Sequence, residues 1–133
     1  MSELWFVDKD QIDEVWAEVE ELISQTDDSE TTTEDIYQYL RSGHWSLWIF
    51  VGDNGIQVAG TTSFVYYGNK KMCRVETVAG TEREDWLWTL KEVENWAKLN
   101  GCMAMDIFGR KGWEKVLKPY DYNFEAVLLR KYF

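Results

Sequence analysis

Cysteine, histidine and proline are scarce in this chain, and their scarcity excludes several classes of protein. The 133 residues include two cysteines, one histidine and one proline. Cys73 and Cys102 fit neither a metal-ligand spacing nor a disulfide framework. We therefore expect no metal site, and a reducing environment such as the cytoplasm.

Long apolar runs are also missing. No stretch approaches the roughly 18 consecutive apolar residues of a membrane-spanning helix. The first residues, Met1–Glu3, have neither the basic region nor the apolar region of a secretory signal. The sequence therefore predicts a protein that is neither secreted nor embedded in a membrane.

Basic residues are nearly absent from the first third of the chain. The net charge is −10, yet residues 1–40 hold 13 acidic residues and one base, Lys9, while residues 41–133 hold 11 acidic and 13 basic residues. Nucleic acid and anionic membrane surfaces are polyanions, so we expect neither as a partner. The acidic third permits a basic protein partner, and a solvated acidic helix face is the simpler interpretation.

Apolar and aromatic residues are abundant. They make up 45% and 16% of the chain, with eight tryptophans, most of which the pattern places in a core. A chain of this length and composition can bury one core, so residues 1–133 are expected to form one domain.

The first half of the sequence predicts a short strand, two helices and then three strands. We expect a strand over Leu4–Val7, a helix capped by Asp8 or Asp10, and a second helix from Thr32 or Thr33 that ends at Ser42-Gly43. Strands are predicted over 45–51, 56–67 and 72–79, and the Asp53-Asn54-Gly55 turn makes them an antiparallel meander.

The second half of the sequence predicts a helix that connects two parallel strands. Its main helix is expected over Thr81–Asn100, with Thr81 and Glu84 forming a capping box. A buried strand over 103–108 follows, then a short helix over 113–118 ended by Pro119, and a last strand over Phe124–Leu129. The pattern predicts a mixed α/β (α+β) sheet.

The element order β-α-α-β-β-β-α-β-α-β resembles that of the GNAT, or N-acetyltransferase-like, superfamily across the whole chain. A narrower likeness rests on residues 96–102 (WAKLNGC) and 109–117 (GRKGWEKVL). These runs resemble the small GNAT-like proteins of tailed phages and prophages, although Asp121-Tyr122 stands where those proteins usually have Gly-Phe.

The resemblance implies an acetyl-CoA site after the third strand of the meander. It assigns donor binding to the backbone from Thr77 to Gly80 and to Thr81, with Arg83 as a compensating charge; the residues are Thr77, Val78, Ala79, Gly80, Thr81 and Arg83. The family's loop pattern is Q/R-x-x-G-x-G/A, and here residues 79–85 read AGTERED. Acidic side chains there repel a pyrophosphate, at about 4 kcal/mol for charges 4 Å apart near a surface. We therefore expect a degenerate site with no cofactor, or acetyl-CoA if the protein is an enzyme.

The resemblance also suggests the catalytic positions. Glu76 lies where the family often places a general base, and it can equally be a partner for Arg74 on the same strand. The family's proton-donating tyrosine corresponds to Leu117, which cannot donate a proton. His44 is expected to be structural or exposed, and Trp88, off the helix stripe, to be an exposed aromatic contact.

Three functions remain open from the sequence. The favoured one is a phage-type protein with a degenerate acetyl-CoA site, acting in the virion or on a host component. A working acetyl-CoA-dependent N-acetyltransferase in the cytoplasm is the first alternative, and an acidic inhibitor of a basic host protein is the second. The resemblance implies phage structural proteins as partners. Head-to-tail self-association is the other expected contact, because a small basic face is opposite in charge to the first helix; it comprises Arg110, Lys111, Lys115 and Lys118.

Overall fold

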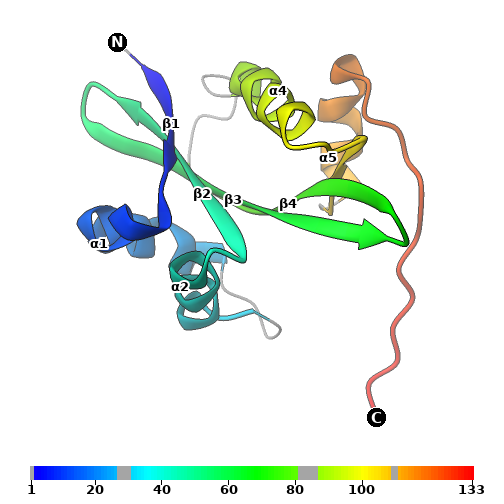
Figure 1. Ribbon diagram of the computed structural model, residues 1–133, viewed down its shortest axis with the longest axis horizontal. Coiled ribbons are helices and arrows are strands. Elements are labelled where there is room, and N and C mark those ends of the chain that lie inside the picture. Colours follow the sequence, from blue (N-terminus) through cyan, green and yellow to red (C-terminus); the bar gives the residue numbers. More distant parts are fainter. Residues whose placement is uncertain (1, 27–30, 81–86, 109–110) are drawn as a thin grey trace.

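The protein forms a five-stranded mixed sheet. The computed structural model describes residues 2–26, 31–80, 87–108 and 111–133. The strands are β1 (Glu3–Val7), β2 (Trp45–Gly52), β3 (Gly55–Tyr67), β4 (Lys70–Gly80) and β5 (Ala104–Ile107), arranged in that order. The pairs β1–β2, β2–β3 and β3–β4 are antiparallel, and β4–β5 is parallel, which confirms the predicted meander and crossover (Figure 1).

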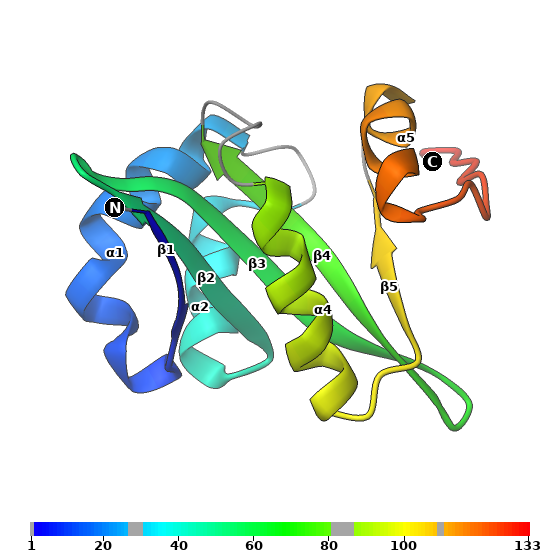
Figure 2. The ribbon, with the colours of Figure 1, turned by 90° about the horizontal axis from the view of Figure 1, so that it is seen from above.

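Helices cover both faces of the sheet. Helices α1 (Ile12–Ile23) and α2 (Thr33–Ser42) lie on one face, and α4 (Leu90–Leu99) lies on the other (Figures 1 and 2). Helix α5 (Lys111–Leu117) follows β5. Short 3-10 turns over 9–11, 24–26, 87–89 and 118–120 flank these helices. No helix within the described ranges is both long and apolar enough to span a bilayer.

The ends of α2 follow directly from its local sequence. The Thr32 hydroxyl accepts from the Asp35 N–H at 3.1 Å, and the Asp35 carboxylate accepts from the Thr32 N–H at 3.1 Å. Gly43 ends the helix with φ +83°, which glycine adopts at little cost. The first helix differs from expectation, because it starts as a 3-10 turn in which the Asp8 carbonyl accepts from Gln11 at 2.8 Å and no side chain caps it. The expected box at Thr81 and Glu84 lies outside the described residues.

Among the described residues, two apolar clusters hold the layers together. The larger lies between the sheet and helices α1 and α2, and its buried members are Val7, Ile12, Val19, Ile23, Ile36, Leu40, Leu47, Ile49, Ala59 and Ala79. The smaller joins α4 and α5 through Leu87, Leu90 and Leu117. Residues 47–50 of β2 are all buried, as expected for a strand covered on both faces.

The C-terminal strand expected over Phe124–Leu129 is not formed. In the described chain beyond Tyr122 no residue belongs to a strand. Apolar composition favours a strand, but a strand also needs an edge to pair with.

The tryptophans are less buried than the pattern predicts. Among the described tryptophans only Trp48 is classed as buried. Trp16, Trp45 and Trp113 are half-buried at the rims of the two clusters. Trp5 is exposed, contrary to expectation, whereas the predicted exposure of Trp88 is confirmed at 49%.

Gly80 is the glycine that the sheet most needs. Its φ is +149°, and a Cβ there would lie 2.4 Å from the Gln57 carbonyl oxygen and 2.9 Å from the Val58 Cα. We predict that Gly80→Ala lowers the free energy of unfolding by about 1–3 kcal/mol or more, measured by urea denaturation. Gly112→Ala is the matched control, since a Cβ at Gly112 meets nothing within 4 Å and alanine favours a helix. Equal effects of the two variants would contradict this role.

Candidate functional site

Glu76 is the extra residue of a β-bulge in the middle of β4. Thr62 of β3 lies opposite Val75, and Thr61 lies opposite Thr77, so Glu76 has no residue opposite it. A bulge inserts one extra residue and changes the direction of the side chains around it. Here Val75 and Val78, which ordinary alternation would point to opposite faces, line the same cavity beneath α4.

The Glu76 carboxylate keeps one oxygen available. Its Oε1 accepts a hydrogen bond from the Ser63 hydroxyl at 2.9 Å, and the side chain is half-buried. Within the described ranges Oε2 makes no hydrogen bond. A carboxylate held at one oxygen and open at the other can accept a proton from a neighbouring amine.

Arg74 is not the partner of Glu76. Its guanidinium lies 3.8 Å from the Asp106 carboxylate, directly across the β4–β5 ladder. It also donates to the Tyr67 hydroxyl at 2.8 Å and stacks on the Phe108 ring, with its central carbon 4.4 Å from the ring centre. The alternative that paired Arg74 with Glu76 is therefore wrong, because the neighbouring strand supplies a different carboxylate.

The pairing between strands β4 and β5 ends next to Glu76. Their ladder joins Met72–Val75 to Ala104–Ile107 and extends no further within the described residues. The rest of β4, residues 76–80, has no partner in β5, and its residues 77–80 pair with β3 alone among the described strands (Figure 2). Within the described part of the chain, the backbone groups on that outer edge therefore have no neighbouring strand to pair with.

Two aromatic residues that follow β5 contact other parts of the described chain. Phe108 is 65% exposed and packs on Arg74, and Trp113 packs into the small cluster around Leu117. Trp86 lies outside the described residues.

Four of the donor-binding residues implied by the resemblance are described, and these four can contribute only backbone groups. The Thr77 hydroxyl shares a 2.6 Å hydrogen bond with Thr61, Val78 faces the cavity beneath α4, and Ala79 is buried. Gly80 ends the strand. Thr81 and Arg83 lie outside the described residues.

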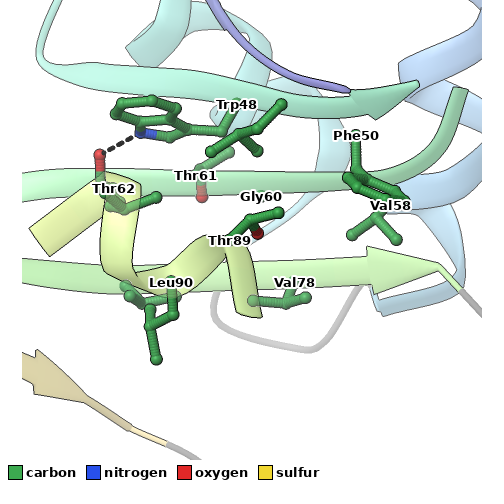
Figure 3. Close-up of a pocket in the computed structure, with 12 residues that line it drawn as sticks. Trp48, Phe50, Val58, Gly60, Thr61, Thr62, Val78, Thr89 and Leu90 are labelled. Atoms are coloured by element: carbon green, nitrogen blue, oxygen red, sulfur yellow. Dashed lines mark hydrogen bonds between the residues drawn. The ribbon is translucent and has the colours of Figure 1, made fainter. Parts of the chain in front are cut away.

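The cavity beneath α4 is a packing gap (Figure 3). Its volume is about 60 Å³, and its walls are almost wholly apolar. The two threonine hydroxyls that β3 contributes are already hydrogen-bonded, since Thr62 accepts from the Trp48 indole at 3.2 Å and Thr61 bonds to Thr77. A cavity with so few available polar groups has little means of orienting a ligand.

Other ionisable groups near the sheet are held in structural roles. Tyr122 donates to Glu94 at 2.7 Å, and burial together with this carboxylate raises the pKa of its hydroxyl. Leu117 is buried, as befits a core residue, and Tyr120 is exposed. Burial raises the pKa of the Cys73 thiol to about 12, so Cys73 stays protonated at neutral pH and cannot act as a nucleophile.

His44 lies at the surface, as expected. It follows α2 and shares a 2.6 Å hydrogen bond with Ser42, the last residue of that helix.

The sequence reasoning missed two residues of the Glu76 region, Ser63 and Asp106. Asp106 could have been noticed as a lone carboxylate within the apolar run 103–108, whereas nothing in the sequence marks Ser63.

Solved structures of acetyltransferases resemble the whole chain at low sequence identity. An acetyltransferase from Trypanosoma brucei superposes with a TM-score of 0.75 at 11% identity, covering 100% of both chains. Glucosamine-6-phosphate N-acetyltransferase from Arabidopsis thaliana gives 0.71 at 13% identity, covering 100% of this chain and 99% of that one. A predicted acetyltransferase from Clostridium acetobutylicum, solved with acetyl-CoA, gives 0.71 at 15% identity, covering 99% of this chain and 96% of that one.

Similarity in sequence is much weaker than similarity in structure. No protein-family model matches the chain, and a search of curated proteins finds no match. The strand order, the parallel β4–β5 pair and the superpositions agree with one another. The chain therefore has the fold of the GNAT acetyltransferases.

Proposed function

We propose that this protein binds acetyl-CoA along the second half of β4 and transfers the acetyl group to an amine. The observation that carries the proposal is the coincidence of two features on one strand. Residues 76–80 have no partner in β5, and the half-buried carboxylate of Glu76 lies at the start of that same segment. A donor-binding edge and a general base thus lie within a few residues of each other.

The described residues fit an acetyl-CoA molecule through their backbone. The pantetheine arm carries amide groups, and an unpaired strand edge offers N–H and C=O groups that pair with amides as a neighbouring strand would. Gly80 ends this edge and has no side chain of its own that could lie beside its backbone N–H group. Val78 and Ala79 point into the protein, which leaves the edge itself unobstructed by them.

Glu76 is the residue that moves a proton in this proposal. When bound, acetyl-CoA supplies an acetyl group activated as a thioester. Glu76 Oε2 takes a proton from the protonated acceptor amine, and the freed nitrogen lone pair then forms the new C–N bond as the C–S bond breaks. CoA leaves as a thiolate and takes up the second proton, which the nitrogen releases as the amide forms. Ser63 holds the other carboxylate oxygen and so keeps the base oriented. Direct transfer needs a base and alignment, so Leu117 in the tyrosine position does not prevent it.

A second candidate is the phage-type virion or host-interaction protein with a degenerate site. Its specific support is Leu117, which is buried in the α4–α5 cluster and leaves the family's proton-donating position without a polar group. The three acidic residues in 82–85 support it from the sequence. In this candidate the fold is retained as a binding surface, and acetyl-CoA binds weakly or not at all.

Acetyl-CoA is predicted to stabilise the protein against heat. A ligand at 100 times its dissociation constant adds about 2.7 kcal/mol to the free energy of unfolding, which raises the melting temperature by several degrees. Differential scanning fluorimetry with millimolar acetyl-CoA measures this shift, with acetate at the same concentration as the control. A melting temperature that stays constant would contradict donor binding and favour the degenerate-site candidate.

Glu76→Gln is predicted to lower kcat/KM about 10²- to 10⁴-fold, because the amide cannot accept the amine proton. The assay follows CoA release from acetyl-CoA in the presence of a panel of primary amines. Ser63→Ala is the matched control, since it removes the orienting hydroxyl but keeps the base, and it should cost less than Glu76→Gln. Glu76→Gln should leave the acetyl-CoA melting shift intact. Equal turnover by Glu76→Gln and the unaltered protein would rule out Glu76 as the base.

A further inference from the structure

The chain beyond Tyr122 exposes several large apolar side chains to solvent. Phe124, Val127, Leu128 and Leu129 are between 63% and 88% exposed. Several large apolar side chains in sequence rarely stay exposed in a soluble protein, and such a patch usually marks a binding surface. We call residues 123–133 the tail.

The tail has the pattern of a strand that is covered on both faces. Phe124, Ala126 and Leu128 share one parity, while Val127 and Leu129 share the other. Apolar residues on both parities are typical of a strand inside a sheet, where layers cover each side. The tail therefore needs a strand edge to pair with and apolar groups above and below it.

The outer edge of β5 offers such an edge. β5 is the last strand in the sheet order, and within the described chain it pairs with β4 alone. The N–H and C=O groups along its outer side form a template for one more strand.

The packing around β5 is incomplete in the same place. The smaller cluster has three buried members, whereas Met105 and Ile107 of β5 and Trp113 of α5 are only half-buried against it. One more apolar strand beside β5 would cover these side chains.

The tail does not pair with the β5 edge of its own molecule. Tyr122 is fixed to the body by its hydrogen bond to Glu94 at 2.7 Å and by its N–H donating to the Leu117 carbonyl at 3.3 Å. Asp121, with φ +66°, turns the chain just before it. From that point the tail runs away from the helices and strands to a C-terminus that lies clear of them (Figure 1).

We propose that two copies of this chain exchange their tails. Residues 124–129 of each copy would pair with the outer edge of β5 in the other, giving a two-fold symmetric dimer in which each tail meets the same surface. The tail has 11 residues and spans about 35 Å when extended, enough to cross to a neighbouring molecule.

The charge distribution permits this contact. The acidic excess of the chain lies in residues 1–40, which form β1, α1 and most of α2. Figure 2 shows β1 and α1 at the opposite end of the molecule from β5 and α5. Residues 41–133 carry a small net positive charge, so two copies can approach at their β5 edges without strong repulsion between their acidic ends.

Light scattering coupled to gel filtration tests the proposal. The unaltered protein should have about twice the chain mass of 15.7 kDa, and Leu129→Lys should return it to that single-chain mass. Leu99→Lys is the matched control, because Leu99 at the end of α4 is also 88% exposed but lies outside the tail, and it should leave the dimer intact. Both variants should fold, since neither leucine is buried in the single chain. A monomeric unaltered protein, or a dimer that survives Leu129→Lys, would overturn the proposal.

A cross-linking experiment separates exchange between copies from pairing within one copy. One tagged chain carries Val127→Cys, and a differently tagged chain carries Ala104→Cys, both with Cys102→Ser; Cys73 is buried and its raised pKa keeps it unreactive. Treatment of the mixture with a short bis-maleimide should give a product that carries both tags. If that product is missing, and one chain carrying both cysteines instead links internally, the exchanged dimer is excluded.

Discussion

The ladder between β3 and β4, with its bulge at Glu76, is the constraint on which the rest of the architecture depends. The bulge reverses the alternation of β4, so that Val75 and Val78 both lie beneath α4 while Ala79 joins the core under α1 and α2. One inserted residue therefore determines which side chains of β4 pack on each face of the sheet. The same residue carries the carboxylate that the proposed chemistry uses.

The proposed activity depends on a difference between the two ends of β4. Its first half is tied to β5 by the ladder and by the ion pair of Arg74 with Asp106. Its second half keeps its bonds to β3 and, within the described ranges, has no strand paired to its outer edge. A rigid strand with an open edge can hold an extended ligand without ordering new backbone, which lowers the entropy cost of binding.

Elements formed by contacts between residues close in sequence could be predicted, whereas those that depend on contacts between distant residues could not. Helix α2 was predicted from the sequence because its capping box joins Thr32 and Asp35, three residues apart. The strand expected over Phe124–Leu129 was wrong because strand propensity supplies no partner edge. The Glu76 bulge and its Ser63 contact could not be predicted, since they arise from the register between two strands. The role of Glu76 itself remains a prediction.

Amide hydrogen exchange on the unaltered protein tests the central claim most directly. Backbone amides of residues 76–80 that point away from β3 should exchange quickly in the free protein and slowly with acetyl-CoA, because the donor would pair with them. Amides of β2, already bonded on both sides, provide the reference. Exchange of residues 76–80 that is the same with and without acetyl-CoA would contradict the account.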